Sequence, residues 1–398
     1  MNPEPKRKTR VTCAPSLAPY LKEELKALGF ECLSMDKTGV EIDATTTDAM
    51  HLNLHLRTAF HVLQRFADIN CRNADELYSE AKRLPWDRVI DPVGFLSVTS
   101  NVRNDTITNS MFPNMRLKDA ICDKLVQQVG KRPDAGAGTE GMVVHLHWVD
   151  NKARIYLNMT GRKLSDRGYR KIPFMAPLRE TIAAAVLMEM KYNGARPLVV
   201  PMCGSGTIAI EAALMAKQRA PGLLRSNYAC NHWLDADKDV WIQLRLDAKK
   251  QMVNGNPAPI VASDIEPDAI DASRKNATTA GVEHLIDFHV CDFASTPMPP
   301  ENGDVVLHGA YGLRLGEDND LLSTYKRIGD FLKTDCAGWD GYVFTSGKPL
   351  IAAIKLKVSK KTPFTNAEID CRLLRYELYK GTKVTTPSNR PPKHQDST

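Results

Sequence analysis

Two glycines near the middle of the chain could bring the backbone close to a bound cofactor. Gly204 and Gly206 lie between an apolar run, "RPLVVPM", and an amphipathic run, "TIAIEAALMA". Glycine lets the backbone approach a ligand closely, and the first N–H groups of the following helix are free to bind it. The same loop could also be only a tight turn between a strand and a helix. The spacing therefore predicts a strand, a loop and a helix, with a cofactor site as one of two interpretations.

Two aspartates follow the next apolar runs and could hold the polar parts of a nucleoside cofactor. Asp264 ends "APIVASD" and Asp292 ends "IDFHVCD". A carboxylate at the first position can accept hydrogen bonds from both ribose hydroxyls, and one at the second can accept an adenine amino group. The interval from Gly206 to Asp264 exceeds the ~20 residues of a simple dinucleotide fingerprint, so an insertion at about 218–256 must intervene. Either aspartate could instead cap a helix or lie in a solvated loop.

The surrounding patterns predict the elements that would position these residues. After about Arg170, apolar strand-like runs alternate with helical runs, which is typical of βαβ units and a parallel sheet. The glycine loop and both aspartates would then lie at the carboxyl edge of that sheet, where ligands bind. Before Arg170, short strands and helices mix, and "MVVHLHWV" and "ARIYLNMT" form a hairpin around "DNK". We expect an α/β Rossmann-like domain preceded by an α+β region.

Composition and charge limit the class of protein. The 398 residues, 43% hydrophobic and 25% charged, indicate a soluble globular protein of two or three domains. No run approaches the ~18 apolar residues that span a membrane, and the basic N-terminus precedes no signal core. The nine cysteines form no CxxC pair, so we expect no metal site, no disulfide framework and a cytoplasmic location. The net charge of +6 permits a polyanionic partner without requiring one.

Several motifs, taken in order along nearly the whole chain, resemble one family. They include "RTAFHVLQRFADINCRNADELYSEAKRLPW", "LNMTGRKLSDRGYRK", "PLRETIAAAVL", "PMCGSGTIAIEAALMA", "ASDIEPDAI", "YGLRLGE" and "FTNAEIDCRLLRYELYKG". The family is the THUMP-domain class I S-adenosylmethionine-dependent RNA methyltransferases. The likeness is greatest to the large-subunit ribosomal RNA guanine-N2 methyltransferases, formerly described as N6-adenine-specific DNA methylases.

The resemblance implies a domain plan and a cofactor site. It implies a ferredoxin-like region at 1–66, a THUMP RNA-binding domain at 67–165, a Rossmann-like methyltransferase domain at 170–384 and a disordered tail at 385–398. The methionine part of S-adenosylmethionine would lie against Pro201, Cys203, Gly204, Ser205, Gly206 and Thr207. Asp264 would hold the ribose and Asp292 the adenine end.

Two positions depart from the family's pattern. Family members usually begin the glycine loop with an acidic residue, as in "DPMCGSGT", whereas this chain has Val200 there. A carboxylate at that place would help orient the cofactor, and valine cannot. The family's catalytic motif reads "NPPYG", whereas residues 308–312 of this chain read "HGAYG".

The chemistry of that motif shows what the second change affects. An exocyclic base amine is a poor nucleophile, and the asparagine oxygen and a backbone carbonyl direct its lone pair by accepting its hydrogens. Tyr311 keeps the aromatic surface on which a flipped base stacks. His308 could accept one hydrogen bond through a neutral ring nitrogen, or it could be a loop histidine without a catalytic role. Gly309 and Ala310 loosen the loop by ~0.5–1 kcal/mol for each replaced proline.

Basic residues in two regions are candidate RNA contacts. The THUMP-like region supplies Arg103, Arg116, Lys118, Lys124, Lys131 and Arg132. The connecting segment supplies Arg162, Lys163, Arg167, Arg170 and Lys171, with Tyr169 among them. Such a mixture binds phosphates and stacks bases. A solvated helix face explains Lys118 and Lys124 as well as RNA does, whereas the denser connecting segment favours RNA.

Three functions are compared. The first is methyl transfer from S-adenosylmethionine to an exocyclic base amine, guanine N2 of 23S ribosomal RNA. The second is a catalytically impaired RNA-binding relative that keeps the cofactor fold. The third, a nicotinamide-dependent dehydrogenase, shares the sheet topology but is disfavoured, because the chain has no simple dinucleotide fingerprint and carries a THUMP-like region. We expect the first function, with ribosomal RNA as the partner and no association with a membrane.

Overall fold

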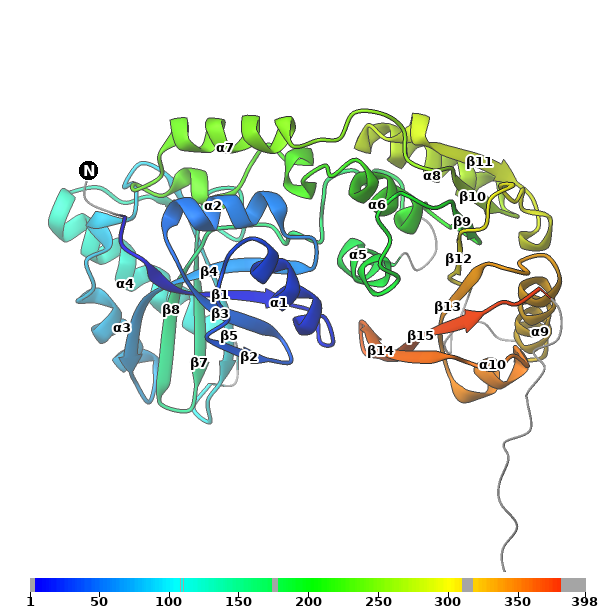
Figure 1. Ribbon diagram of the computed structural model, residues 1–398. Helices are drawn as coiled ribbons and strands as arrows, with labels where there is room; N and C mark the ends of the chain where they lie inside the picture. Colours follow the sequence, from blue (N-terminus) through cyan, green and yellow to red (C-terminus); the bar gives the residue numbers. More distant parts are fainter. Residues whose placement is uncertain (1–3, 108, 110, 174–177, 310–317, 381–398) are drawn as a thin grey trace, which may run out of the picture.

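Two β-sheets, one in each half of the molecule, organise the chain in the computed structural model (Figure 1), which describes residues 4–107, 109, 111–173, 178–309 and 318–380. The tail at 385–398 lies outside these ranges, as do Ala310 and Tyr311. No helix in the described part of the chain combines the length and apolar character needed to cross a bilayer.

The first sheet has the order β2-β3-β1-β4-β8-β7-β5-β6. Its strands are β1 Arg7–Cys13, β2 Ser34–Asp36, β3 Gly39–Ala44, β4 Ala59–Asn70, β5 Phe95–Arg103, β6 Asp134–Ala135, β7 Met142–Val149 and β8 Lys152–Asn158. Its helices are α1 Ala18–Ala27, α2 Thr46–His55, α3 Ala74–Lys82 and α4 Met111–Val129, with a 3-10 turn at Trp86–Arg88. The predicted hairpin is confirmed as the antiparallel pair β7 and β8.

One long strand joins the two regions that the sequence divides at residue 66. β4 pairs with β1 along one edge and with β8 along the other, so the ferredoxin-like and THUMP-like parts share a continuous sheet. The alternation of apolar and polar residues along β4 does not reveal that the two regions share a sheet, because the strands that pair with β4 are set by tertiary contacts.

The second sheet has the order β11-β10-β9-β12-β13-β15-β14. Its strands are β9 Leu198–Pro201, β10 Ile260–Asp264, β11 Ile286–Val290, β12 Asp304–Leu307, β13 Asp340–Ser346, β14 Lys360–Asn366 and β15 Ile369–Glu377. The predicted parallel sheet is confirmed from β11 to β13, and β15 and β14 extend it antiparallel. The fold class is therefore the predicted one, an α/β Rossmann-like domain preceded by an α+β region.

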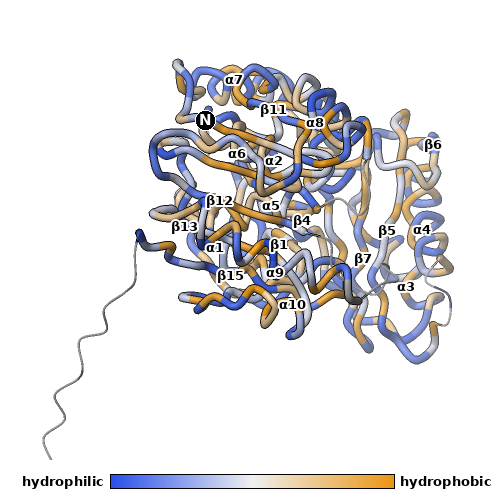
Figure 2. The backbone as a smooth tube through the Cα atoms, turned by 90° about the vertical axis from the view of Figure 1, so that its right-hand side faces the viewer, coloured by the Kyte–Doolittle hydropathy of each residue, from blue (hydrophilic) through white to orange (hydrophobic). Residues whose placement is uncertain are grey.

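Helices cover both faces of this second sheet. They are α5 Glu180–Glu189, α6 Thr207–Ala216, α8 Pro267–Ala280, α9 Asp318–Thr334 and α10 Lys348–Ala353, whereas α7 Lys238–Lys250 lies over the first half (Figure 1). Further 3-10 turns are Pro221–Leu224, Ala229–His232, Glu283–Leu285 and Phe293–Ser295. α5 and α6 are apolar on nearly all sides and are buried, whereas the outer helices α7 and α8 alternate hydrophilic and hydrophobic segments (Figure 2). α7 lies within the expected insertion and packs on α2 of the first half (Figure 1).

Candidate cofactor and active site

The point where the strand order of the second sheet reverses gathers the candidate residues. β9 lies between β10 and β12, and the carboxyl ends of parallel strands meet at one edge of the sheet. The glycine loop follows β9, Asp264 ends β10, Asp292 follows β11 and His308 follows β12. Such a reversal leaves a crevice in which open α/β sheets bind their ligands.

The glycine loop has a backbone that its residue types make possible. Gly204 and Gly206 have φ of 55° and 79°, in the left-handed region, and Met202 shares it at 59°. A Cβ on Gly206 would lie within 2.9 Å of the Ser273 hydroxyl oxygen, so a side chain there would clash. A Cβ on Gly204 would meet nothing within 4 Å. The loop therefore packs tightly on α8 at Gly206 and leaves open space beside Gly204.

Asp264 is fixed by the backbone around it. Its Oδ2 accepts the N–H of Gly204 at 2.9 Å and its Oδ1 accepts the N–H of Glu266 at 3.2 Å. Each carboxylate oxygen keeps a second lone pair, so the group is oriented and can still accept two hydroxyl donors. The next residue, Ile265, is 61% exposed, and sequence reasoning missed it. The sequence feature that could have identified Ile265 is an apolar residue directly after the aspartate that ends a strand. An exposed apolar side chain at that position can cover the flat ring of a ligand.

Asp292 already has partners within the chain. Its Oδ1 accepts Nη2 of Arg327 on α9 at 2.7 Å and the N–H of Ala294 at 3.0 Å, so it caps the turn at Phe293–Ser295. Partial burial raises the pKa of this carboxyl. The hydrogen bonds from Arg327 and from the Ala294 N–H together lower the pKa by more, so it lies below its ordinary value. Asp292 therefore caps a turn, which is the alternative role that its position in the sequence also allowed. An adenine amino group bound there would share this carboxylate with Arg327.

His308 lies at the end of β12, close to the glycine loop. Burial lowers the pKa of its imidazole to about 4, so the ring is neutral near pH 7 and one nitrogen can accept a hydrogen bond. Its ring centroid is 5.5 Å from that of Phe344. A Cβ built on the next residue, Gly309, would lie 3.6 Å from Cε of Met202, which places the altered motif against the loop after β9.

The connecting segment corrects part of the predicted RNA surface. Arg167 and Tyr169 are 2% and 1% exposed, so neither side chain can reach RNA. The Arg167 guanidinium and the Tyr169 hydroxyl both donate to Oε1 of Glu211, at 3.4 and 3.2 Å. Arg170 is held inside as well, by Glu180 and Ser205. Positive charge here compensates buried carboxylates, because a buried charge requires a partner.

The other candidate RNA contacts differ in how free they are. Arg116 pairs with Asp75 at 2.6 Å, and Lys118 lies 3.3 Å from Asp119. Arg103 and Arg132 are exposed, Arg103 at the end of β5 and Arg132 just after α4. With Lys131, which is also exposed, these two are the more accessible cations of the predicted set in the THUMP-like part.

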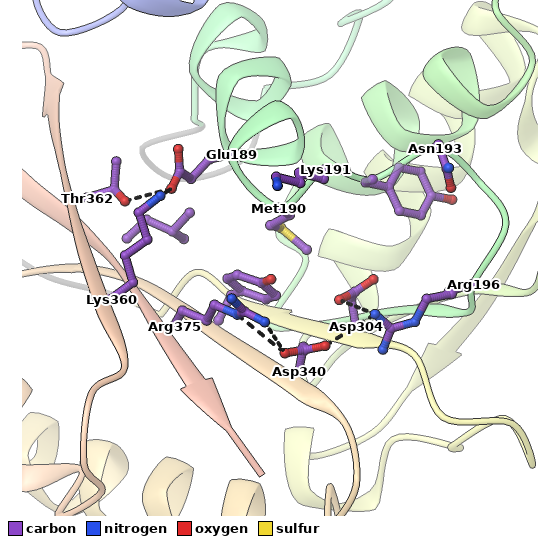
Figure 3. Close-up of a pocket in the computed structure, with 13 residues that line it drawn as sticks. Glu189, Met190, Lys191, Asn193, Arg196, Asp304, Asp340, Lys360, Thr362 and Arg375 are labelled. Carbon is purple, nitrogen blue, oxygen red and sulfur yellow. Dashed lines mark hydrogen bonds and ion pairs between the residues drawn. The ribbon is translucent and has the colours of Figure 1, made fainter.

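A cavity of about 350 Å³ lies at the opposite, amino-terminal edge of the sheet (Figure 3). Asp340 is flanked there by Arg375 at 2.9 Å and Arg196 at 3.2 Å. Asp304 begins β12, and burial raises the pKa of its carboxyl to about 6. These charges pair with one another, and they lie at the far end of β12 from His308. The cavity is therefore separate from the edge where the glycine loop and Asp264 meet.

Three known domain families match successive parts of the chain. The RlmL ferredoxin-like domain matches residues 9–63 and the THUMP domain matches 71–158. The RMKL-like methyltransferase domain matches 167–375, more than half of the chain. The matched ranges follow the order of the two sheets.

Named relatives cover nearly all of the chain. The ribosomal RNA large subunit methyltransferase K/L of Psychromonas ingrahamii is 34% identical over 379 residues, which are 92% of this chain and 50% of that protein. A candidate RNA methyltransferase of Synechocystis sp., slr0064, is 32% identical over 368 residues, 92% of this chain and 96% of that protein. The chain thus spans about half the length of the K/L relatives that it matches.

A solved structure shares the fold. The crystal structure of SMU.472, a candidate methyltransferase complexed with SAH, superposes with a TM-score of 0.85 at 23% identity, covering 96% of this chain and 100% of that one. At this identity the likeness shows the common fold.

Proposed function

This chain belongs to the RMKL-like methyltransferase family, and from that membership we propose that it transfers a methyl group from S-adenosylmethionine to an exocyclic base amine of ribosomal RNA. The names of the K/L relatives support the large-subunit RNA as substrate, and guanine N2 is the amine we propose. The observation that carries the proposal is the convergence of an open glycine loop, an oriented Asp264 and a neutral His308 at one sheet edge. We propose the cytoplasm as the place where this methylation of ribosomal RNA occurs.

The residues fit a nucleoside cofactor. The open space beside Gly204 gives room for the methionine part, Asp264 would accept the ribose hydroxyls, and Ile265 would cover the adenine ring. When bound, S-adenosylmethionine would supply an electrophilic methyl group: its bond from sulfur to the methyl carbon breaks, sulfur keeps the electron pair in S-adenosylhomocysteine (SAH), and the methylated nitrogen gives up one proton to solvent. His308 would accept one hydrogen of the base amine and so direct its lone pair toward the methyl carbon. The exposed cations Arg103 and Arg132 would hold RNA phosphates.

The cofactor assignment is tested at Asp264. Replacing Asp264 by alanine should weaken SAH binding by ~1.5–3 kcal/mol, roughly 10- to 100-fold, because a charge-assisted hydrogen bond to the ribose is lost. Calorimetric titration with SAH measures this, and Asp264→Asn should lose less, since its amide oxygen can still accept. Asp268→Ala is the matched control, because Asp268 is exposed in the first turn of α8. An Asp264→Ala variant that binds SAH as the parent does would rule out this pocket.

The RNA surface is tested by salt dependence. Charge reversal at Arg132 should weaken binding to unmodified ribosomal RNA and lower the slope of log affinity against log salt by about one unit for each lost phosphate contact. Arg103→Glu should act likewise. Lys22→Glu, on the exposed side of α1, is the control. If neither arginine variant changes the slope while Lys22→Glu also leaves it constant, the phosphates lie on another surface.

A further inference from the structure

The guanidinium of Arg170 joins three parts of the chain at the glycine loop. Its Nε donates to Oε1 of Glu180 at 2.9 Å, its Nη1 to Oγ of Ser205 at 2.8 Å, and its Nη2 to the carbonyl of Leu178 at 2.8 Å. The side chain is 14% exposed and that of Glu180 9%. A planar fork with several donors suits such a three-way contact, and a lysine could not reproduce it.

Asn276 of α8 holds the same loop residue from the other side. Its Nδ2 donates to the carbonyls of Ser205 at 3.2 Å and Ile172 at 3.0 Å. Its Oδ1 accepts the N–H groups of Lys171 at 2.9 Å and Ile172 at 3.1 Å. Asn276 is fully buried. The segment 170–172 and α8 therefore enclose Ser205, the residue between the two left-handed glycines.

We infer that Arg170 is a positioning residue for the cofactor, acting through Ser205, and this rests on the proposed function. Met202, a non-glycine residue of the loop, holds a φ of 59°, a conformation that a free loop would leave. The Arg170 fork keeps that conformation in the absence of ligand, so the ordering cost is removed from cofactor binding. The segment continues to Arg167, which bonds the Arg57 carbonyl in the first half, so the RNA-binding half is tied to the cofactor loop.

The test separates this role from a structural one. Arg170→Lys keeps a cation beside Glu180 and should leave the unfolding temperature of the cofactor-free protein near that of the parent. It should raise the Kd of SAH and the KM of S-adenosylmethionine about tenfold, the loss of one charge-assisted hydrogen bond, with kcat changed far less. Ser205→Ala should do the same. The double variant should lose no more than either single one, because both changes break one contact. Arg83→Lys is the control, an exposed arginine paired with Glu80 and outside every proposed site.

Backbone hydrogen exchange at 203–207 gives a readout that does not need the cofactor. Arg170→Lys should speed exchange there about tenfold, whereas Arg83→Lys should not. Arg170→Lys that binds SAH as tightly as the parent, or additive losses in the double variant, would overturn the inference. If the parent itself binds no SAH, the proposed function fails, and unchanged exchange in Arg170→Lys would then independently overturn the positioning role.

Discussion

Replacing Glu211 by alanine is expected to lower the free energy of unfolding by ~3–5 kcal/mol, because it leaves the buried Arg167 guanidinium without its counter-ion. Glu211 is fully buried and Arg167 is 2% exposed. Burial raises the pKa of Tyr169 well above its ordinary value, so its hydroxyl stays protonated and donates to the same carboxylate oxygen. One acceptor therefore serves two buried donors, and both lose it together. Urea unfolding followed by tryptophan fluorescence measures the change.

Two control variants separate the loss of charge from the loss of any surface ion pair. Glu211→Gln keeps an oxygen for both donors and should lose less than Glu211→Ala. Glu283→Ala removes the partner of Arg274 at 2.6 Å, but those side chains are 35% and 48% exposed, so the loss should stay below about 1 kcal/mol. A Glu211→Ala variant as stable as Glu283→Ala would show that Arg167 is satisfied by its carbonyl contacts alone.

The connecting segment shows where reading a sequence fails. A dense run of cations beside an aromatic residue is typical of an RNA surface, yet Arg167 pairs with the buried Glu211 and Arg170 with Glu180. The missed signal was Glu211 itself. A lone carboxylate inside the otherwise apolar run "TIAIEAAL" cannot be buried without a cation beside it. The sequence therefore predicts a buried cation as partner of Glu211 but does not identify that residue.

The cofactor edge was more predictable, for a physical reason. Residues at the carboxyl ends of parallel strands meet whatever the rest of the fold does, so the strand pattern sufficed to bring Asp264 to the glycine loop. The hydrogen bond from Arg327 to Asp292 was not predictable. Arg327 lies on α9, which follows β12 in the sequence, and its packing beside the end of β11 is set by tertiary contacts. The continuous first sheet escaped prediction likewise, since β4 pairs with strands on both sides of the assumed boundary.

The altered catalytic motif leads to the second large effect. Restoring the family sequence by His308→Asn, Gly309→Pro and Ala310→Pro together should raise the single-turnover rate of methyl transfer on the order of 10²-fold. A Cβ at residue 309 would lie 3.5 Å from the Tyr325 hydroxyl oxygen, an ordinary contact, and Gly309 is not in the left-handed region. The position thus has room for a side chain, and a stiff turn would hold the base amine in line. His308→Asn alone should give only part of the gain, because Gly309 lacks the fixed φ of the family's proline.

The measurement is methyl transfer to unmodified ribosomal RNA at saturating cofactor, with SAH affinity determined for each variant. His284→Asn, on the exposed surface, is the control and should match the parent. Nearly constant SAH affinity would place the gain in the delivery of the base rather than in the cofactor pocket. A parent already as fast as the triple variant would show that the neutral imidazole of His308 serves as well as an amide. If every variant binds SAH and RNA but none transfers a methyl group, the defect lies outside this motif, and Val200 is the next position to test. That side chain is 1% exposed within the apolar core, so it can neither orient the cofactor nor be replaced by an acid without burying a charge.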